Sequence, residues 1–100
     1  MTIKKKKDGS SMIISVSGQM DTVTAPELDA VVDNELDGIT DLTLDFDGLT
    51  YSSSAGLRVI LKAQKKMNRQ GKMKVINVNR EVMELLEVTG FVDFLTIVPA

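Results

Sequence analysis

The sequence predicts a single α/β domain, with one mixed sheet and helices packed on it. Short stretches in which apolar and polar residues alternate, a pattern typical of strands, are separated by longer stretches with apolar residues at helical spacing. Strands separated by helices need crossover connections, so we expect the later strands to run parallel. With 100 residues, 43% of them hydrophobic, the chain has room for one core, and we assign residues 1–100 to one domain.

The first expected element is an antiparallel pair of strands joined at Asp8-Gly9, a dipeptide that favours hairpin turns. Residues 3–7 are too charged for a buried strand. We therefore expect their lysines at or near the sheet edge, where positive charge discourages edge-to-edge pairing. Every second residue from 12 to 16 is apolar, which suits a strand packed mainly on one face, and Gly18 ends this strand.

A helix should begin next, near Thr24. Thr24 and Glu27 have the spacing of a capping box, and Pro26 falls in the first turn, where its missing N–H costs nothing. Apolar residues recur at helical spacing through Leu36, and Gly38 is the expected C-terminal stop.

The next strand is expected over residues 42–46 and should run into Asp47-Gly48. A short loop over residues 51–54 then leads to a second helix from about Ala55 to Gln70, closed by Gly71. We expect this helix to be amphipathic, with apolar residues inside and basic residues outside. The inner residues are Leu57, Ile60, Leu61 and Met67, and the outer ones are Arg58, Lys62, Lys65, Lys66 and Arg69.

The last third of the chain continues the alternation. Residues 73–78 should form a strand, Asn79 should cap a third helix that stops at Gly90, and residues 95–98 should form a final short strand. The expected order is therefore β-β-α-β-α-β-α-β, with about four to five strands. Loops at the carboxyl ends of parallel strands are the usual place for a site. We expect these loops to hold Asp45, Asp47 and the serines.

Composition excludes several function classes. The chain has neither Cys nor His, which removes disulfides, thiolate nucleophiles, Ser-His-Asp triads and the usual zinc sites. The net charge of -2 gives no reason to expect nucleic acid as a partner. No apolar stretch approaches the ~20 residues that span a bilayer, and no signal-peptide pattern follows the basic N-terminus. We expect a cytoplasmic protein that is not an enzyme, needs no cofactor and does not insert into membranes.

Three consecutive serines, residues 52–54, stand between a strand and the start of a helix. One interpretation is that Ser54 only caps the helix, by accepting a hydrogen bond from an N–H one turn further on. The other is phosphorylation, because a phosphate with about -1.5 to -2 charges is stabilised by the free N–H groups and positive dipole end of a helix N-terminus. The residue types by themselves leave both interpretations open.

Other kinds of site fit the residues less well. A nucleophile elbow needs G-x-S-x-G, and residues 52–56 lack the first glycine, while the chain lacks a histidine to activate the serine. A P-loop motif is also absent. Carboxylates can gather around Mg²⁺, but at strand ends they are more often solvated, so we predict no metal site. The aspartates concerned are Asp21, Asp41, Asp45 and Asp47.

Residues 49–61, LTYSSSAGLRVIL, resemble the signature of STAS domains, the family of bacterial anti-sigma factor antagonists. A second match, residues 18–21 followed by Thr24, is similar to the family's G-x-L-D-x-x-T segment before the first helix. The spacing of the two motifs, the break at Gly71 and the ending over residues 86–91 also fit. The resemblance covers nearly the whole chain and implies a single STAS-like domain.

The resemblance also implies partner switching. In the family, the unphosphorylated domain binds an anti-sigma factor that is also a serine kinase, which frees the sigma factor. Phosphorylation by that kinase ends the binding, and a serine phosphatase resets it. The family's acceptor is the first hydroxyl residue of Asp-Ser-[Ser/Thr]-Gly, which matches residues 53–56 here and implies that Ser54 is the acceptor. Asp21 matches an acidic position close to the acceptor.

The sequence departs from this motif at Ser53, where the family commonly has Asp, and at Ala55, where it has a second hydroxyl. Ser52 and Ser53 are the alternative acceptors. We expect the partner to contact the loop after Met20, the serine loop and the exposed face of the second helix. The expected contact residues are Asp21, Thr24, Ser53, Ser54, Gly56, Arg58 and Lys62.

Two other functions stay open at this point. One is a STAS-type scaffold or lipid-transporter subunit, in which the serines only cap the helix. The other is a small nucleotide- or ligand-binding module that uses the loops at the strand ends.

Overall fold

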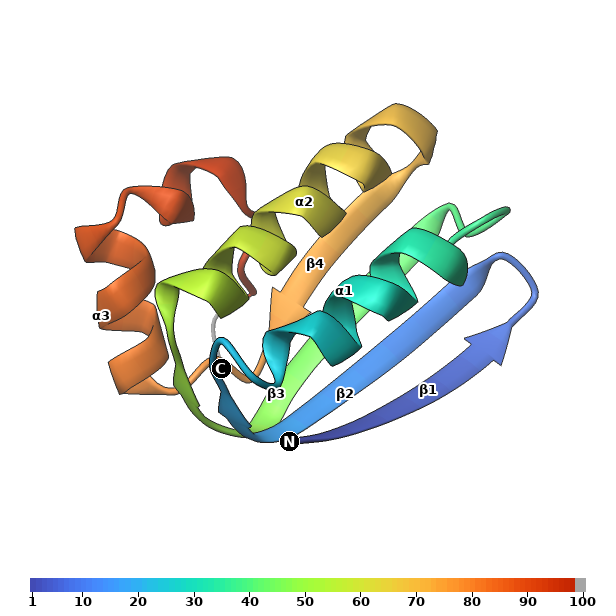
Figure 1. The fold of residues 1–100 in the computed structure, drawn as a ribbon. Helices are drawn as coiled ribbons and strands as arrows, with labels where there is room; N and C mark the ends of the chain where they lie inside the picture. The colour runs from blue at the N-terminus through green and yellow to red at the C-terminus, as the bar shows by residue number, and fades with distance from the viewer. Residues whose placement is uncertain (99–100) are drawn as a thin grey trace.

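The computed structural model describes residues 1–98, which form a four-stranded mixed sheet covered by helices (Figure 1). The strands lie in the order β1-β2-β3-β4. Their bounds are β1 Thr2–Asp8, β2 Ser11–Met20, β3 Asp41–Ser52 and β4 Lys72–Ile76. β1 pairs antiparallel with β2, and β3 and β4 add in parallel. The expected mixed sheet, with parallel strands later in the chain, is confirmed.

The helices are α1 Ala25–Asn34, α2 Ser54–Gln70 and α3 Arg80–Val88, followed by the 3-10 turn η1 Phe91–Phe94. α1 and α2 lie side by side over the sheet, and α3 and η1 lie near the end at which the parallel strands finish (Figure 1). The Asn79 cap is confirmed, because its side chain accepts a hydrogen bond from the Val82 N–H at 2.8 Å.

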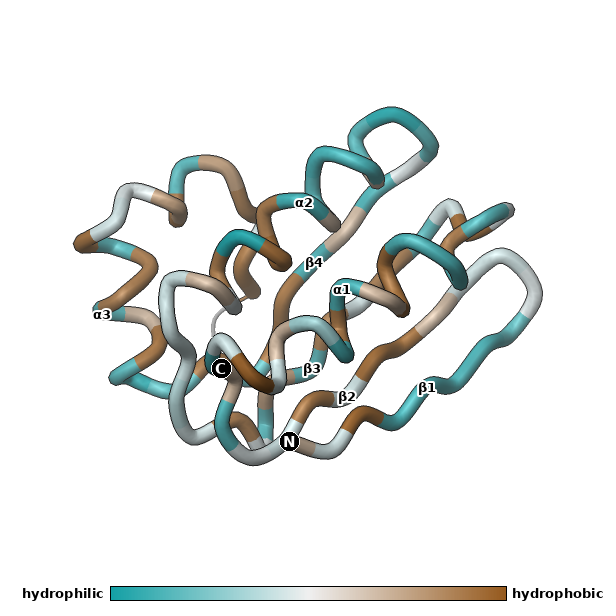
Figure 2. The backbone as a smooth tube through the Cα atoms, viewed as in Figure 1, coloured by the Kyte–Doolittle hydropathy of each residue, from teal (hydrophilic) through white to brown (hydrophobic). Residues whose placement is uncertain are grey.

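The core lies between the sheet and the helices, where hydrophobic segments of both layers meet (Figure 2). Alternate residues of β2 and β3 point into it, as the period-two pattern predicts. The buried residues that the strands contribute include Met12, Ile14, Val16, Leu42, Leu44 and Phe46, and those of the helices include Leu28, Val32, Leu57, Ile60 and Met67. Leu61 is an exception to the prediction for α2, since it is only partly buried.

β1 is an edge strand, as its lysines predict. Only Ile3 is partly buried in this strand, and the other residues of Thr2–Asp8 are exposed. The Lys5 ammonium pairs with the Glu35 carboxylate just after α1, at 2.8 Å. One lysine of the edge therefore ties the strand to the helix layer.

β3 is longer than predicted. The dipeptide Asp47-Gly48 is not a turn, because Gly48 pairs with Ser17 after a shift in register and pairing continues to Ser52. A Cβ at position 48 would lie 2.6 Å from the Ser17 Cβ, so the bare backbone of glycine lets the strands stay together here. Asp45 and Asp47 consequently lie within the strand, and the prediction that they lie in loops at the carboxyl ends of the strands is wrong.

α1 also differs from its prediction at both ends. The Thr24 hydroxyl makes no capping hydrogen bond, so the capping box with Glu27 is wrong. The helix ends at Asn34 instead of near Gly38. Beyond it the Gln70 side-chain amide, at the end of α2, donates to the carbonyls of Leu36 and Ile39 at 2.7 and 2.6 Å, which holds this segment as a loop.

The predicted final strand is reduced to one parallel bridge between Val75 and Ile97. Val75 donates to the Thr96 carbonyl and accepts from the Val98 N–H, each at 2.9 Å. Because η1 occupies Phe91–Phe94, only the last described residues reach the β4 edge. The observed order is therefore β-β-α-β-α-β-α.

Candidate functional site

The two sequence motifs meet where β2 and β3 end. These strands are parallel neighbours, and Met20 is paired with Ser52 at their last positions. The Ser53 N–H donates to the Met20 carbonyl at 2.8 Å, so the loop before α1 and the serine loop before α2 are joined through their backbones. Two segments that are far apart in the sequence thus form one surface at the carboxyl end of the sheet.

Asp21 and Thr24 shape the first of these loops. The Asp21 carboxylate accepts the N–H groups of Val23 and Thr24 at 2.9 and 3.0 Å. The Thr24 hydroxyl donates to the Gln19 carbonyl at 2.9 Å and accepts the Asp21 N–H, also at 2.9 Å. This closed set of bonds explains why Thr24 does not cap α1, and it fixes the loop beside the serines.

The same bonds set the ionisation of Asp21. The backbone N–H groups of Thr24 and Val23 lower the pKa of its carboxyl from the ordinary 3.8, because they stabilise the charged form. Asp21 therefore stays a carboxylate near neutral pH, and it keeps a negative charge next to the serine loop.

The three serines have different environments. Ser52 is 1% exposed, and its hydroxyl donates to the Ser53 carbonyl at 3.1 Å. Ser53 is the N-cap residue of α2, but its hydroxyl oxygen is buried without a hydrogen-bond partner. Ser54 is the first residue of α2 and is exposed. The prediction that Ser54 caps the helix is wrong, because Ser53 occupies the cap position.

Gly56 lets the first turn of α2 pack closely on the strand ends. A Cβ at this position would lie 2.6 Å from the Ser52 hydroxyl oxygen and 2.7 Å from the Met20 Cγ. A side chain here would have to displace the Ser52 and Met20 side chains or push the helix away from both loops. The motif glycine therefore sets the distance between α2 and the site.

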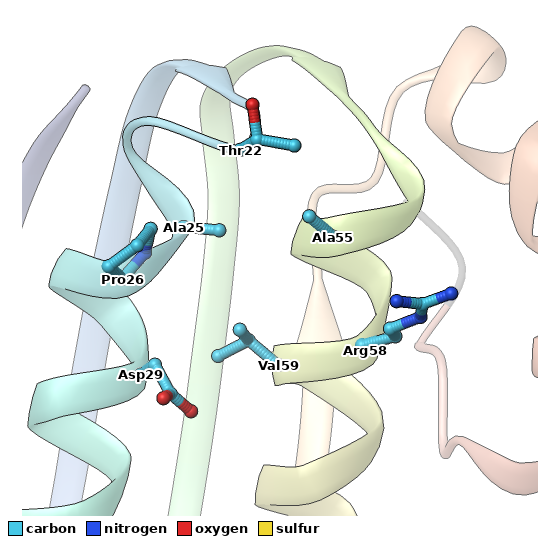
Figure 3. A pocket seen from close by; sticks show the side chains of 7 residues that line it. All are labelled: Thr22, Ala25, Pro26, Asp29, Ala55, Arg58 and Val59. Atoms are coloured by element: carbon cyan, nitrogen blue, oxygen red, sulfur yellow. The ribbon is translucent and has the colours of Figure 1, made fainter.

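A groove of about 360 Å³ lies between the first turns of α1 and α2 (Figure 3). Its lining residues are Thr22, Ala25, Pro26, Asp29, Ala55, Arg58 and Val59. In Figure 3 Val59 points toward α1, whereas the Arg58 guanidinium extends along the other side of α2, away from α1. The groove itself is mostly apolar, and Arg58 presents its charge to the outside.

Lys62, one turn after Arg58, is tied to α1. Its ammonium lies 2.9 Å from the Asp29 carboxylate and 2.6 Å from that of Asp33. The hydrogen bonds that this ammonium donates to the carboxylates of Asp33 and then Asp29 raise the pKa of Lys62 above its ordinary 10.5. Any partner that uses Lys62 has to compete with these two carboxylates.

Two exposed apolar side chains beside the site escaped the sequence analysis. Val23, in the loop after Asp21, is 81% exposed, and Tyr51, just before the serines, is 50% exposed. The only signal in the sequence is a single apolar residue within each polar segment. An exposed aromatic side chain such as that of Tyr51 is a typical anchor point for a protein partner, and the Val23 side chain adds exposed apolar surface at the same end of the sheet.

Among residues 1–98, no group of three or more acidic residues is arranged to hold a metal ion. The Asp45 carboxylate accepts hydrogen bonds from the Asn77 side-chain amide and the Asp47 N–H, each at 3.0 Å. Asp41 lies at the start of β3, at the opposite end of the strand from the loop that contains Asp21. Within the same residues, no helix is long and apolar enough to cross a membrane.

Comparison with known proteins gives a consistent result. The family model described as STAS domain matches residues 2–100. The chain is 24% identical over 98 residues to the anti-sigma-B factor antagonist of Bacillus subtilis strain 168, covering 97% of this chain and 90% of that protein.

Two solved structures share the fold. The crystal structure of an anti-sigma factor antagonist from Mycobacterium paratuberculosis has a TM-score of 0.88 at 22% identity and covers 99% of this chain and 86% of that one. The Bacillus cell fate determinant SpoIIAA in its phosphorylated form has a TM-score of 0.77 at 13% identity and covers 98% and 92%. With nearly every residue inside the matched region, this chain belongs to the STAS domain family.

Proposed function

We propose that this protein is an anti-sigma factor antagonist, whose unphosphorylated form binds a serine-kinase anti-sigma factor and releases the sigma factor in the cytoplasm. Phosphorylation at Ser54 ends the binding, and a serine phosphatase restores it. The observation that carries the proposal is the exposure of Ser54 at the start of α2, beside Asp21, while Ser52 is buried and the Ser53 hydroxyl is enclosed. Similarity to anti-sigma factor antagonists supports the role of this chain as an antagonist. Because Ser54 is exposed, a kinase can reach it without unfolding the strand end.

The local structure suits a reversible phosphate at Ser54. As the first residue of α2, Ser54 stands where backbone N–H groups have no partner within the helix and where the dipole is positive. A phosphate there adds about -1.5 to -2 charges without cost to the helix. The fold therefore tolerates both the phosphorylated and the unphosphorylated form of Ser54. The change in charge affects a partner that contacts this end of α2.

The partner surface in this proposal consists of the two joined loops and the first turns of α2. Asp21 and Thr24 hold the loop shape, Gly56 sets the depth of α2, and Ser53 and Ser54 lie at the centre. The flanking contacts are Arg58, Lys62, Val23 and Tyr51. The added phosphate joins the Asp21 carboxylate in a concentrated negative patch, and like charges brought together at an interface cost several kcal/mol.

The test is to incubate the purified chain with each serine-kinase anti-sigma factor of its source organism and ATP. The added phosphate is then located by intact mass and peptide fragmentation. We expect one phosphate on Ser54, absent from Ser54→Ala and still present in the Ser52→Ala and Ser53→Ala controls. Ser54→Asp should bind the kinase about 100-fold more weakly, equivalent to about 2.7 kcal/mol, with unchanged unfolding.

The other outcomes separate the alternatives. Binding without phosphate on any serine would indicate a constitutive antagonist or a scaffold. Absence of binding, together with co-purification of a transporter ATPase, would favour a transporter subunit. Thermal stabilisation by GTP or ATP alone would favour a ligand-binding module.

A further inference from the structure

The outer face of α2 bears a stripe that starts at the proposed acceptor. Ser54, Arg58, Leu61 and Lys65 follow one another at spacings of four, three and four residues, so they lie along one side of the helix. Arg58, Leu61, Lys62 and Lys65 line a shallow groove of about 320 Å³ on this side. Leu61 is only partly buried, which makes it an apolar position between two cations.

The charges of this stripe are not balanced within the fold. α2 contains five basic residues and no acidic one. Lys62 pairs with Asp29 and Asp33, and the Lys66 ammonium donates to the Val32 carbonyl of α1 at 2.9 Å. Arg58 and Lys65 are exposed, and neither has an ion-pair partner among residues 1–98.

We propose that Ser54, Arg58, Leu61 and Lys65 form a docking surface for an acidic, apolar-centred segment of the anti-sigma factor. This inference rests on the proposed function and names the chemistry of the partner. The partner's carboxylates pair with Arg58 and Lys65, and an apolar side chain between them packs on Leu61. Charge complementarity of this kind sets partner choice and orientation as well as affinity.

The surrounding charges favour a protein over a nucleic acid or an anionic membrane. On α1, Asp29 and Asp33 already pair with Lys62, while the exposed Glu27 has no ion-pair partner among residues 1–98. α3 adds Glu81 and Glu87, which are exposed and likewise without an ion-pair partner in the described part of the chain. An extended polyanion laid on α2 would meet these acidic residues on neighbouring elements. A single acidic segment confined to the α2 stripe would not.

The stripe also connects docking to the switch. Ser54 and Arg58 are four residues apart on one helix, the spacing at which side chains pair. A phosphate on Ser54 forms a charge-assisted pair with the Arg58 guanidinium. Phosphorylation then adds negative charge and also pairs with Arg58, the first cation of the docking surface. The partner's carboxylate consequently loses its contact with Arg58.

The test compares charge reversals on and off this surface. The affinity of the kinase anti-sigma factor is measured for wild type, Arg58→Glu, Lys65→Glu and the control Lys74→Glu. Lys74 is an exposed lysine of β4 that alternates with the buried Met73 and Val75, so it faces away from the helices. We expect Arg58→Glu and Lys65→Glu each to weaken binding at least about tenfold, and we expect this loss of affinity to be smaller at high salt. Lys74→Glu should bind with the affinity of the wild type. Circular dichroism and urea unfolding should match wild type for all three.

A second measurement tests the link to Ser54. Phosphorylation lowers the affinity for the anti-sigma factor by some factor, and we expect this factor to be at least about threefold smaller in Arg58→Ala than in wild type. The reason is that the variant lacks the guanidinium with which the phosphate pairs. Equal reductions would overturn the pairing of phosphoserine with Arg58. If the wild type binds and Arg58→Glu and Lys65→Glu bind as tightly as wild type or as Lys74→Glu, the docking surface is overturned. The proposed function is then left intact. No binding by wild type would overturn both.

Discussion

The two ends of the sheet differ in how their backbones are held. At the amino ends of the parallel strands, Thr40 donates to the Ser10 carbonyl at 2.8 Å and accepts the Lys72 N–H at 2.9 Å. Gly71 packs so closely here that a Cβ would overlap the Thr40 carbonyl oxygen. Three strands are thus linked through one residue.

The carboxyl end is more open. The two site loops are joined by the hydrogen bond from Ser53 to Met20, while the Ser53 hydroxyl has no partner. Val23, Tyr51 and Ser54 are exposed at this end. We infer that the amino end holds the fold together, whereas the carboxyl end keeps side chains free for contacts that are made only with a partner.

The strongest test of this division is Gly71→Ala. The new methyl group meets fixed backbone, so we expect about 3 kcal/mol of destabilisation by urea unfolding. Gly38→Ala is the matched control, since a Cβ there has no atom within 4 Å and only its φ of +79° opposes the change. We expect about 1 kcal/mol for the control. Equal costs would contradict the tight packing of the amino end.

Gly56→Ala should cost less, about 1 to 2 kcal/mol. The new methyl group meets the Ser52 hydroxyl oxygen and the Met20 Cγ and Cε, which are side-chain rather than backbone atoms, and alanine favours the helix. The same movement disturbs the site, so partner affinity should fall as well. Loss of stability without loss of affinity would show that the depth of α2 is irrelevant to binding.

Val23→Ala should leave stability unchanged and weaken partner binding by about 0.5 to 1 kcal/mol, because an exposed anchor side chain is shortened. Val88→Ala is the control, because Val88 is similarly exposed (85% against 81%) but lies at the end of α3. Both affinities are measured by titration calorimetry. If the two variants lose the same affinity, the site does not extend to Val23.

The smallest expected effect is the pH dependence contributed by Asp21. Its pKa is lowered in the folded state, so its stabilising contribution is present above the ordinary value of 3.8 and disappears as the pH falls through the lower folded pKa. The difference in unfolding free energy between wild type and Asp21→Asn should therefore be constant near neutral pH and shrink below about pH 4. Urea titrations over this range measure it, with Asp37→Asn as an exposed-carboxylate control. A difference that does not change with pH would exclude the charge of Asp21 as its source.

Much of the fold follows from local patterns in the sequence. The lysine-rich edge strand, the alternating core residues of β2 and β3, and the amphipathic α2 were all predictable, because each depends on residues a few positions apart. The Asn79 cap was also predictable, since its acceptor and donor lie three residues apart. The join between a strand and a helix at the serines was visible for the same reason.

The tertiary structure decided what depends on distant partners. β3 passes through Asp47-Gly48 because β2 offers it a pairing surface, and Thr24 turns from α1 to the Gln19 carbonyl because β2 ends there. Which serine is exposed likewise depends on how α2 packs on Met20. A local pattern fixes the backbone preference of a segment, but hydrogen-bond partners and burial are set by whatever the fold brings beside it.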